Sequence, residues 1–461
     1  MLSLSLVACG EAKLESEPIR RPDVVLVSID SLRPDHLRAY GYERDTSPVF
    51  DRLAAEGILF RDAVSTSSWT LPAHAALFTG LFDSAHGLIR DDRALAPAHR
   101  TLAELLAEAG YRTGGFYGGP YLDPSFGLAQ GFETWQSCMT RLPEMLSPED
   151  ARREARAGMG RSHSDVTGPR TLEAVKTWLA GAEERPFFLF VHLWDVHYDY
   201  IPPPGYAERY DPDYTGDLDP RRFTKNPRIH AEMPARDLEH LVALYDGEIR
   251  FTDEILGRIL NEVDAIGRLE QALVIVTADH GEEFFEHQGK GHRQTLFEEV
   301  VRVPLVIRLP GGMESGRIIS APARLVDLLP TVLARAGVAP PDYVQGRDLA
   351  ATWEGRPAPP QSTLLELHGP KRSVYALRQS RRKLISLGNG RYGFYDLDVS
   401  PPEQQSLPSD APGLRDAVQE LERSIRESQS LARKIGVAKQ GDRQLDPDLT
   451  RRLEALGYLD D

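Results

Sequence analysis

The sequence contains only two cysteines, Cys9 and Cys138, among its 461 residues. So few thiols cannot build a disulfide framework, and they also exclude a metal site made of cysteine ligands. Cys138 lies close in sequence to Trp135 and is expected to be a buried, unreactive thiol. Any metal site in this protein therefore has to use oxygen ligands and imidazoles.

Long apolar runs and positive charge are also scarce. No stretch reaches the roughly 18 apolar residues that a membrane-spanning helix needs. Lysine and arginine number 54 against 69 aspartates and glutamates, which gives a net charge of −15. This balance argues against a nucleic-acid-binding protein, which needs a basic face. It leaves an anionic substrate open, because a metal ion and a few local cations can dominate one pocket.

The N-terminal segment has its own character. Residues 6–9 resemble a bacterial lipobox, in which Cys9 would carry a lipid anchor. The basic start of a signal peptide is missing and the apolar run is too short to span a bilayer, so a chance match is the alternative. We expect residues 1–22 to be a signal- or lipoprotein-like segment and tether. The resulting location is the cell envelope, on its periplasmic or extracellular face.

Apolar runs that alternate with helical patterns fill most of the chain. The runs at 23–30, 186–192, 273–280 and 303–308 predict strands that are buried on both faces. Strands that alternate with helices predict an α/β/α sandwich around a mostly parallel sheet. We assign this catalytic domain to residues 23–360.

The pattern changes after residue 360. Short runs with alternating polar and apolar residues predict a small antiparallel sheet. Helical patterns follow at about 411–434 and 447–457. We expect residues 361–461 to form a C-terminal subdomain that packs on the first domain.

Residues 68–80 predict a loop that turns into a helix. Pro72 suits the first helical turn, where its missing N–H is no loss. The hydroxyl of Thr70 would then lie at the positive end of a helix, beside unpaired backbone N–H groups. Such a place favours an oxygen nucleophile or a bound anion. The alternative is that Thr70 is an ordinary helix N-cap.

Acidic and histidine side chains follow the predicted strands. Asp30 ends one strand, and Asp279 and His280 end another. Together with Thr70 they suit a divalent cation, which would lower the pKa of the threonine hydroxyl. The alternatives are a helix-capping aspartate and a simple turn after Asp279. His192, inside an apolar strand, is expected to be a core histidine.

Several ordered motifs resemble the sulfatase family within the alkaline-phosphatase superfamily. They lie at 27–37, 46–57, 70–80, 86–87, 278–282, 298–305, 326–331, 395–397 and 453–458, so the resemblance runs from about residue 21 to the end of the chain. It implies an alkaline-phosphatase-like α/β/α sandwich.

The resemblance also implies roles for individual residues. Asp30, Asp279 and His280 would bind a divalent metal (Ca, Mn, Mg or Zn), and Thr70 would sit on it as the nucleophile. His197 resembles the family histidine that contacts the substrate anion or the leaving group. His292 and Arg293 are candidates for anion contact or proton donation, and His74 completes the set of candidate catalytic residues.

Three departures from the family pattern bear on the chemistry. Sulfatases have cysteine or serine where this chain has Thr70, and they oxidise that residue to formylglycine. Threonine cannot yield this aldehyde, because its β-carbon already bears a methyl group. His74 replaces the signature arginine, and Ser31 replaces one metal-binding aspartate. These changes resemble the superfamily branch that uses a Thr or Ser alkoxide on phosphate esters, phosphonates or phosphoglycerol lipids.

These observations predict a sulfatase-like metal-dependent hydrolase that acts on sulfate, phosphate or phosphonate esters through Thr70. The substrate would be a sulfated or phosphorylated small molecule, glycan or lipid. One alternative is a transferase that passes a phosphoryl head group to an acceptor at the membrane surface. Another is a non-catalytic protein that binds anionic glycans. The sequence leaves the oligomeric state open.

Overall fold

The computed structural model describes residues 21–139, 166–181, 183–356, 361–369, 372–399 and 401–436, together with residues 447, 449, 450 and 453. Cys9 and most of the predicted helix at 447–457 lie outside the described residues. The lipid anchor and that helix therefore stay predictions. No described helix is both long enough and apolar enough to cross a membrane.

A large mixed sheet forms the centre of the molecule. Its strands, in spatial order, are β10 (Arg317–Ile319), β2 (Ile58–Val64), β9 (Arg302–Arg308), β6 (Leu273–Ala278), β1 (Val24–Ile29), β5 (Phe187–Leu193), β3 (Arg112–Tyr117) and β4 (Thr134–Ser137), with β11 (Ala323–Arg324) also beside β2. Only β9 runs against its neighbours β2 and β6, and the other pairs are parallel. The mostly parallel sheet is therefore confirmed.

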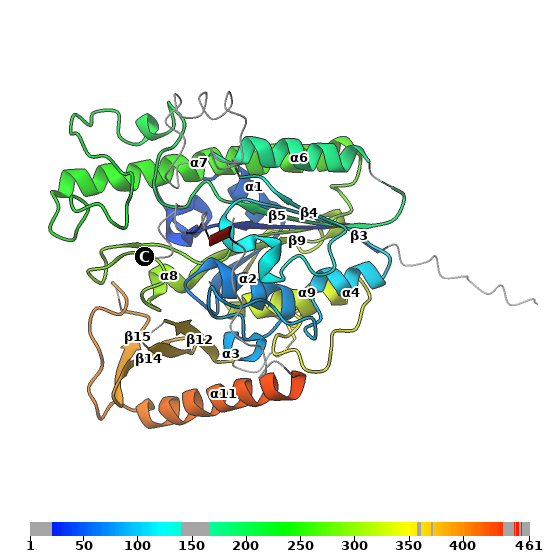
Figure 1. Ribbon diagram of the computed structural model, residues 1–461. Coiled ribbons are helices and arrows are strands. Elements are labelled where there is room, and N and C mark those ends of the chain that lie inside the picture. The colour runs from blue at the N-terminus through cyan, green and yellow to red at the C-terminus, as the bar shows by residue number, and fades with distance from the viewer. Residues whose placement is uncertain are drawn as a thin grey trace, which may run out of the picture.

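Helices cover both faces of this sheet (Figure 1). On one face lie α1 (Pro48–Glu56), α6 (Gly168–Ala180) and α7 (Ala235–Ala265), and on the other lie α2 (Thr70–Thr79), α4 (Leu102–Glu108) and α9 (Leu328–Arg335). The residues of β1, β5 and β6 are all buried, as expected for strands covered on both sides. The predicted α/β/α sandwich is thus the fold.

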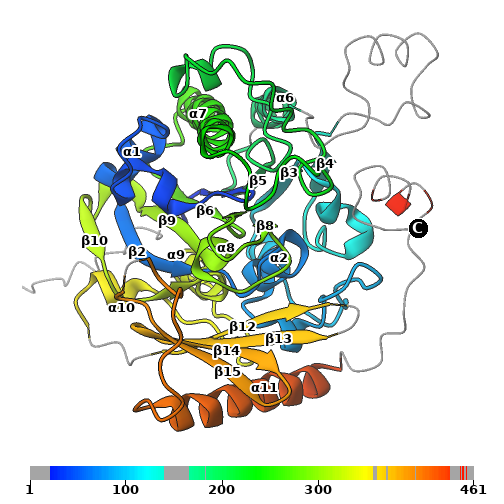
Figure 2. The ribbon, with the colours of Figure 1, turned by 90° about the vertical axis from the view of Figure 1, so that its left-hand side faces the viewer.

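A second, antiparallel sheet packs beyond α2 (Figure 2). It consists of β12 (Thr363–His368), β13 (Ser373–Arg378), β14 (Arg382–Gly388) and β15 (Arg391–Asp396). The helix α11 (Leu414–Ile435) covers its outer face with Ala417 and Leu421, in one apolar cluster with Leu364 and Leu377. The antiparallel sheet is confirmed, and the domain boundary at residue 360 stays a prediction.

A buried ionic network joins the two sheets. Glu298, in the short helix α8 (Glu298–Val301), binds Arg378 of β13 and Lys383 of β14. Lys383 also lies 3.0 Å from Glu403 Oε1, and Arg378 lies 2.7 Å from Asp62 of β2. Burial by itself would raise the pKa of Glu298, but the two cations hold it well below its usual value. Removal of any one charged side chain would therefore leave its partner as an uncompensated buried charge.

Candidate active site

Parallel strands bring the candidate metal ligands to one edge of the central sheet. Ile29 of β1 is paired with Ala278 of β6, so that Asp30 and Asp279 leave the sheet side by side. Both residues and the adjacent His280 are fully buried. The carboxyl ends of strands are the usual ligand-binding edge of such a sheet, and the site lies there.

Thr70 reaches the same edge from α2. It is the first residue of the helix, and Trp69 occupies the N-cap position. The Thr70 hydroxyl lies 3.4 Å from Asp30 Oδ2 and 3.4 Å from His280 Nε2. It therefore does not cap the helix, and the alternative of an ordinary N-cap is not what the structure shows.

The segment before Thr70 is held by the antiparallel sheet. The Glu366 N–H of β12 donates to the Thr66 carbonyl at 2.9 Å, and the Ser67 hydroxyl donates to the Glu366 carbonyl at 2.9 Å. The Glu366 carboxylate in turn accepts the N–H of Ser84. The position of Thr70 thus depends on residues almost 300 positions later in the chain.

His74 fixes the first turn of α2 from inside. Its Nδ1–H donates to the Thr70 carbonyl at 2.8 Å, and its Nε2 accepts the Ser28 hydroxyl at 3.1 Å. Burial lowers the pKa of His74 to about 3, so the ring is neutral near pH 7. Both ring nitrogens are committed to these bonds. His74 is therefore a positioning residue in this structure, with its Nδ1 also 3.8 Å from Asp279 Oδ2. Its catalytic role stays a prediction.

The two carboxylate oxygens of Asp279 differ in their hydrogen bonding. Its Oδ1 accepts the His280 N–H at 2.9 Å and the Ser31 N–H at 3.3 Å. Its Oδ2 is buried and has no hydrogen-bond partner among the residues that the structure describes. A buried carboxylate oxygen without a partner is costly, and a cation is one way to satisfy it.

The electrostatics of the site also favour a cation. Burial, together with the charge of Asp30, raises the pKa of Asp279 well above its usual value. Burial works in the same direction on Asp30, but the imidazoles around it hold its pKa well below its usual value. Two carboxylates at zero exposure repel each other unless a cation lies between them. Asp30, Asp279 and His280 offer donor atoms within 4.8 Å of one another, a set that fits a divalent metal.

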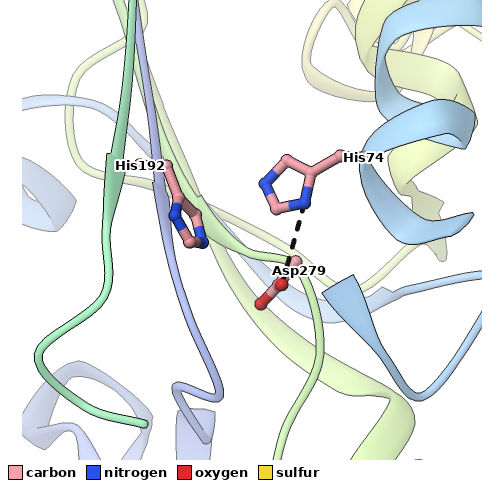
Figure 3. Close-up of side chains that lie close together, drawn as sticks. All are labelled: His74, His192 and Asp279. Carbon is pink, nitrogen blue, oxygen red and sulfur yellow. Dashed lines mark ion pairs between the residues drawn. The ribbon is translucent and has the colours of Figure 1, made fainter. Parts of the chain in front are cut away.

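His192 of β5 belongs to this group as well, although its sequence context predicted a core histidine. Figure 3 shows His192, His74 and Asp279 turned toward one another from three different elements. The Nε2 atom of His192 lies 3.3 Å from Asp30 Oδ2. The signal that could have found it is register, because His192 is paired with Ser28, two residues before Asp30.

His197 and His292 lie next to the metal-ligand candidates. The His292 ring is 4.4 Å from the His280 ring and 5.0 Å from the His197 ring, measured between centroids. His292 Nδ1 lies 3.0 Å from Glu282 Oε1, and His197 stacks on Trp194. The structure thus brings both predicted histidines beside the site.

Arg293 has a different position. Its guanidinium binds Asp91 and the Tyr121 hydroxyl, and it stacks over the Trp69 ring at 4.0 Å. Its backbone N–H donates to the Ser68 carbonyl at 2.9 Å. Arg293 therefore supports the loop before Thr70, and the described contacts do not place its guanidinium among the metal-ligand candidates.

The sequence is similar to those of known sulfatases. The chain is 25% identical to an ulvan-active sulfatase of Formosa agariphila, over 88% of this chain and 81% of that protein. It is 24% identical to an N-acetylglucosamine-6-O-sulfatase of Bacteroides thetaiotaomicron, over 88% of this chain and 86% of that protein.

Solved structures share the fold. A phosphonate monoester hydrolase of Agrobacterium radiobacter superposes with a TM-score of 0.73 at 21% identity, covering 89% of this chain and 96% of that one. The family model for the C-terminal part of N-sulphoglucosamine sulphohydrolase matches residues 286–430. The sulfatase family model matches residues 22–338, more than half of the chain. The chain therefore belongs to the sulfatase family and is an ester hydrolase.

Proposed function

We propose that this protein is a divalent-metal-dependent hydrolase of phosphate or phosphonate esters in which Thr70 is the nucleophile. The observation that carries the proposal is the Thr70 hydroxyl, which lies 3.4 Å from both Asp30 and His280 in a buried group of metal-type donors. The phosphonate monoester hydrolase among the structural neighbours supports the choice of a phosphorus ester. The sulfatases among the relatives make a sulfate ester the competing substrate.

The residues that would hold the metal are Asp30, Asp279, His280 and Thr70. When bound, the metal would neutralise the ester's anionic oxygens and lower the pKa of the Thr70 hydroxyl. Such neutralisation matters because charge on the equatorial oxygens has to be stabilised during displacement at phosphorus.

The reaction proceeds in two displacements at phosphorus. First, Thr70 Oγ forms a bond to phosphorus, the bond from phosphorus to the leaving-group oxygen breaks, and the Thr70 proton is released as the leaving group departs as an alcohol. Water then attacks phosphorus, the bond between phosphorus and Thr70 Oγ breaks, and a proton returns to that oxygen. His197 and His292, beside the cluster, are the candidates to contact the leaving group. Burial lowers the pKa of His197 to about 3 and that of His292 well below its usual value, so His292, the candidate donor, would first have to take up the proton released by Thr70.

The His74 imidazole serves this chemistry indirectly. By accepting the Ser28 hydroxyl and donating to the Thr70 carbonyl, it fixes the first residue of α2 against β1. A nucleophile that is held in one position needs less reorganisation to reach the transition state.

The test compares Thr70→Ala, Thr70→Ser and Thr79→Ala on aryl phosphate mono- and diesters, an aryl phosphonate and an aryl sulfate. Each of Mn²⁺, Zn²⁺, Mg²⁺ and Ca²⁺ is supplied in turn. Thr79 is the matched control, because its buried hydroxyl donates to the Ala75 carbonyl at the far end of the same helix. We expect Thr70→Ala to lower kcat by at least about 10³-fold, as loss of a nucleophile does. Thr70→Ser should keep partial activity and Thr79→Ala should keep full activity.

Two results would contradict the proposal. Unchanged turnover in Thr70→Ala would exclude the nucleophile, and faster turnover of the aryl sulfate than of every phosphorus ester would exclude the substrate class. Mass spectrometry of acid-quenched protein gives an independent readout, since Thr70 should carry the phosphoryl or phosphonyl group during turnover.

The cellular setting is a separate proposal. An anchor at Cys9 would hold the enzyme at the cell envelope, where anionic ester substrates on lipids and glycans are within reach. Metabolic labelling with a fatty-acid analogue, compared between the natural protein and Cys9→Ser, tests this anchor.

A further inference from the structure

Two histidines of the site share one arrangement. His280 Nδ1 lies 2.9 Å from the Gly281 carbonyl, and His192 Nδ1 lies 2.7 Å from the Gly118 carbonyl. A carbonyl oxygen can only accept, so each Nδ1 carries the proton and donates it. In the neutral ring, Nε2 then has a lone pair, and in both residues this atom lies beside the carboxylates. Metal-binding histidines typically show this pattern, with one nitrogen donating to a carbonyl and the other on the metal.

The environment of His192 Nε2 suits a positive charge, either a proton on the ring or a bound cation. The atom is buried and has no hydrogen-bond partner in the part of the chain that the structure describes, although Asp30 Oδ2 is only 3.3 Å away. A protonated ring forms an ion pair with Asp30 here, whereas the lone pair of a neutral ring would face the carboxylate oxygen unfavourably. A cation between the two atoms turns the same arrangement into an attractive one.

Two buried atoms without a hydrogen-bond partner among the described residues lie near each other. His192 Nε2 and Asp279 Oδ2 both lack a hydrogen-bond partner among the described residues, and the His74–His192–Asp279 group has its donor atoms within 4.8 Å of one another. His74 belongs to this group by distance alone, because its two nitrogens already bond to Thr70 and Ser28. His192 is therefore the member whose nitrogen is available to a metal.

We propose that His192 is a further ligand of the divalent metal, so that the protein ligands beside Thr70 are two carboxylates, from Asp30 and Asp279, and two imidazoles, from His280 and His192. This inference rests on the metal-dependent function proposed above and specifies its metal site. His192 Nε2 lies 3.3 Å from Asp30 Oδ2, and His280 Nε2 lies 3.7 Å from Asp30 Oδ1 and 3.5 Å from Asp279 Oδ2. Asp279 belongs both to the metal-type group with His192 and to the group with Asp30 and His280.

The donor set also predicts which metal binds. Imidazole nitrogens suit Zn²⁺, Mn²⁺ and related transition metals, whereas Ca²⁺ and Mg²⁺ prefer sites made of oxygen. A site with two nitrogens should therefore bind Zn²⁺ tightly and should be displaced only weakly by Ca²⁺ or Mg²⁺.

X-ray absorption spectroscopy on the zinc-loaded full-length protein tests the proposal, because it counts imidazole ligands without any substrate. We expect two imidazoles in the natural protein, one in His192→Gln and two in His74→Gln, the matched control. Removal of His192 should also weaken zinc binding, measured by competition with a chelating dye, by more than the roughly 10- to 100-fold that loss of an outer partner costs.

Three outcomes would overturn the inference. They are a single imidazole in the natural protein, an unchanged count in His192→Gln, and loss of an imidazole in His74→Gln instead. If His192→Gln does not fold, the imidazole count in the natural protein decides. A zinc-loaded protein with one imidazole that still hydrolyses a phosphorus ester would refute the role of His192 and leave the proposed function standing. Failure to bind any divalent metal would refute both.

Discussion

The pH dependence of stability should contain a contribution from one buried histidine outside the active site. His99 is fully buried, and its Nε2–H donates to the His86 carbonyl at 3.0 Å. Its Nδ1 has no hydrogen-bond partner among the described residues. Burial, and then the neighbouring His86, lower the pKa of His99 from 6.5 to about 4. Between these two values the unfolded chain binds a proton that the folded chain does not bind.

The sign and the size of the effect follow from this difference. Because the unfolded state holds the extra proton, the free energy of unfolding falls as the pH falls from 6.5 toward 4. Linkage with these two pKa values gives a loss of about 2 kcal/mol between pH 7 and pH 5. His99→Gln keeps an N–H donor for the His86 carbonyl and cannot titrate, so it should lack this loss.

Urea unfolding of the metal-free proteins at several pH values measures the effect. The difference in unfolding free energy between the natural protein and His99→Gln should shift by about 2 kcal/mol in favour of the variant on going from pH 7 to pH 5. His230→Gln, at an exposed histidine, is the control and should follow the natural protein. A difference between the natural protein and His99→Gln that stays constant over this pH range would refute the reasoning.

Two further substitutions test the framework around the site. Lys383→Met leaves Glu403 without its cation in a buried place, so it should lower the free energy of unfolding by about 3 kcal/mol in urea titrations, while Arg381→Met at an exposed arginine should change it little. Gly281→Ala would place a Cβ 2.1 Å from the Glu299 carbonyl oxygen, which cannot rotate away, so about 1–3 kcal/mol of stability and part of the zinc affinity should be lost. Equal stability of the natural protein and either variant would contradict these contacts.

The sheet could be predicted from the sequence mainly where its strands are buried on both faces. The apolar runs that became β1, β5, β6 and β9 are long and continuous, and this pattern is typical of central parallel strands. The strand β2 was missed because Arg61 and Asp62 interrupt its apolar pattern. Asp62 is explained by the ion pair with Arg378, a residue more than 300 positions away, which local sequence cannot reveal.

In the candidate site, too, some residues could be predicted from the local sequence and others only from the tertiary structure. Asp30, Asp279 and His280 could be found because they directly follow recognisable strands and match family motifs. His192 could not, since a histidine inside an apolar strand looks like a core residue until the strand order places β5 beside β1. Arg293 was predicted to contact an anion, but its guanidinium binds Asp91 and Tyr121. Its partners come from loops whose positions depend on tertiary packing.

The attachment of β12 to the segment before Thr70 has a consequence for how the protein is made. The candidate site draws on Asp30, Thr70 and Asp279, and the strand that holds the Thr66 carbonyl begins only at Thr363. A chain that emerges from the ribosome in order contains Thr70 long before it contains β12, which holds the segment before Thr70. The complete site can therefore assemble only near the end of synthesis, once residues beyond 366 have left the ribosome.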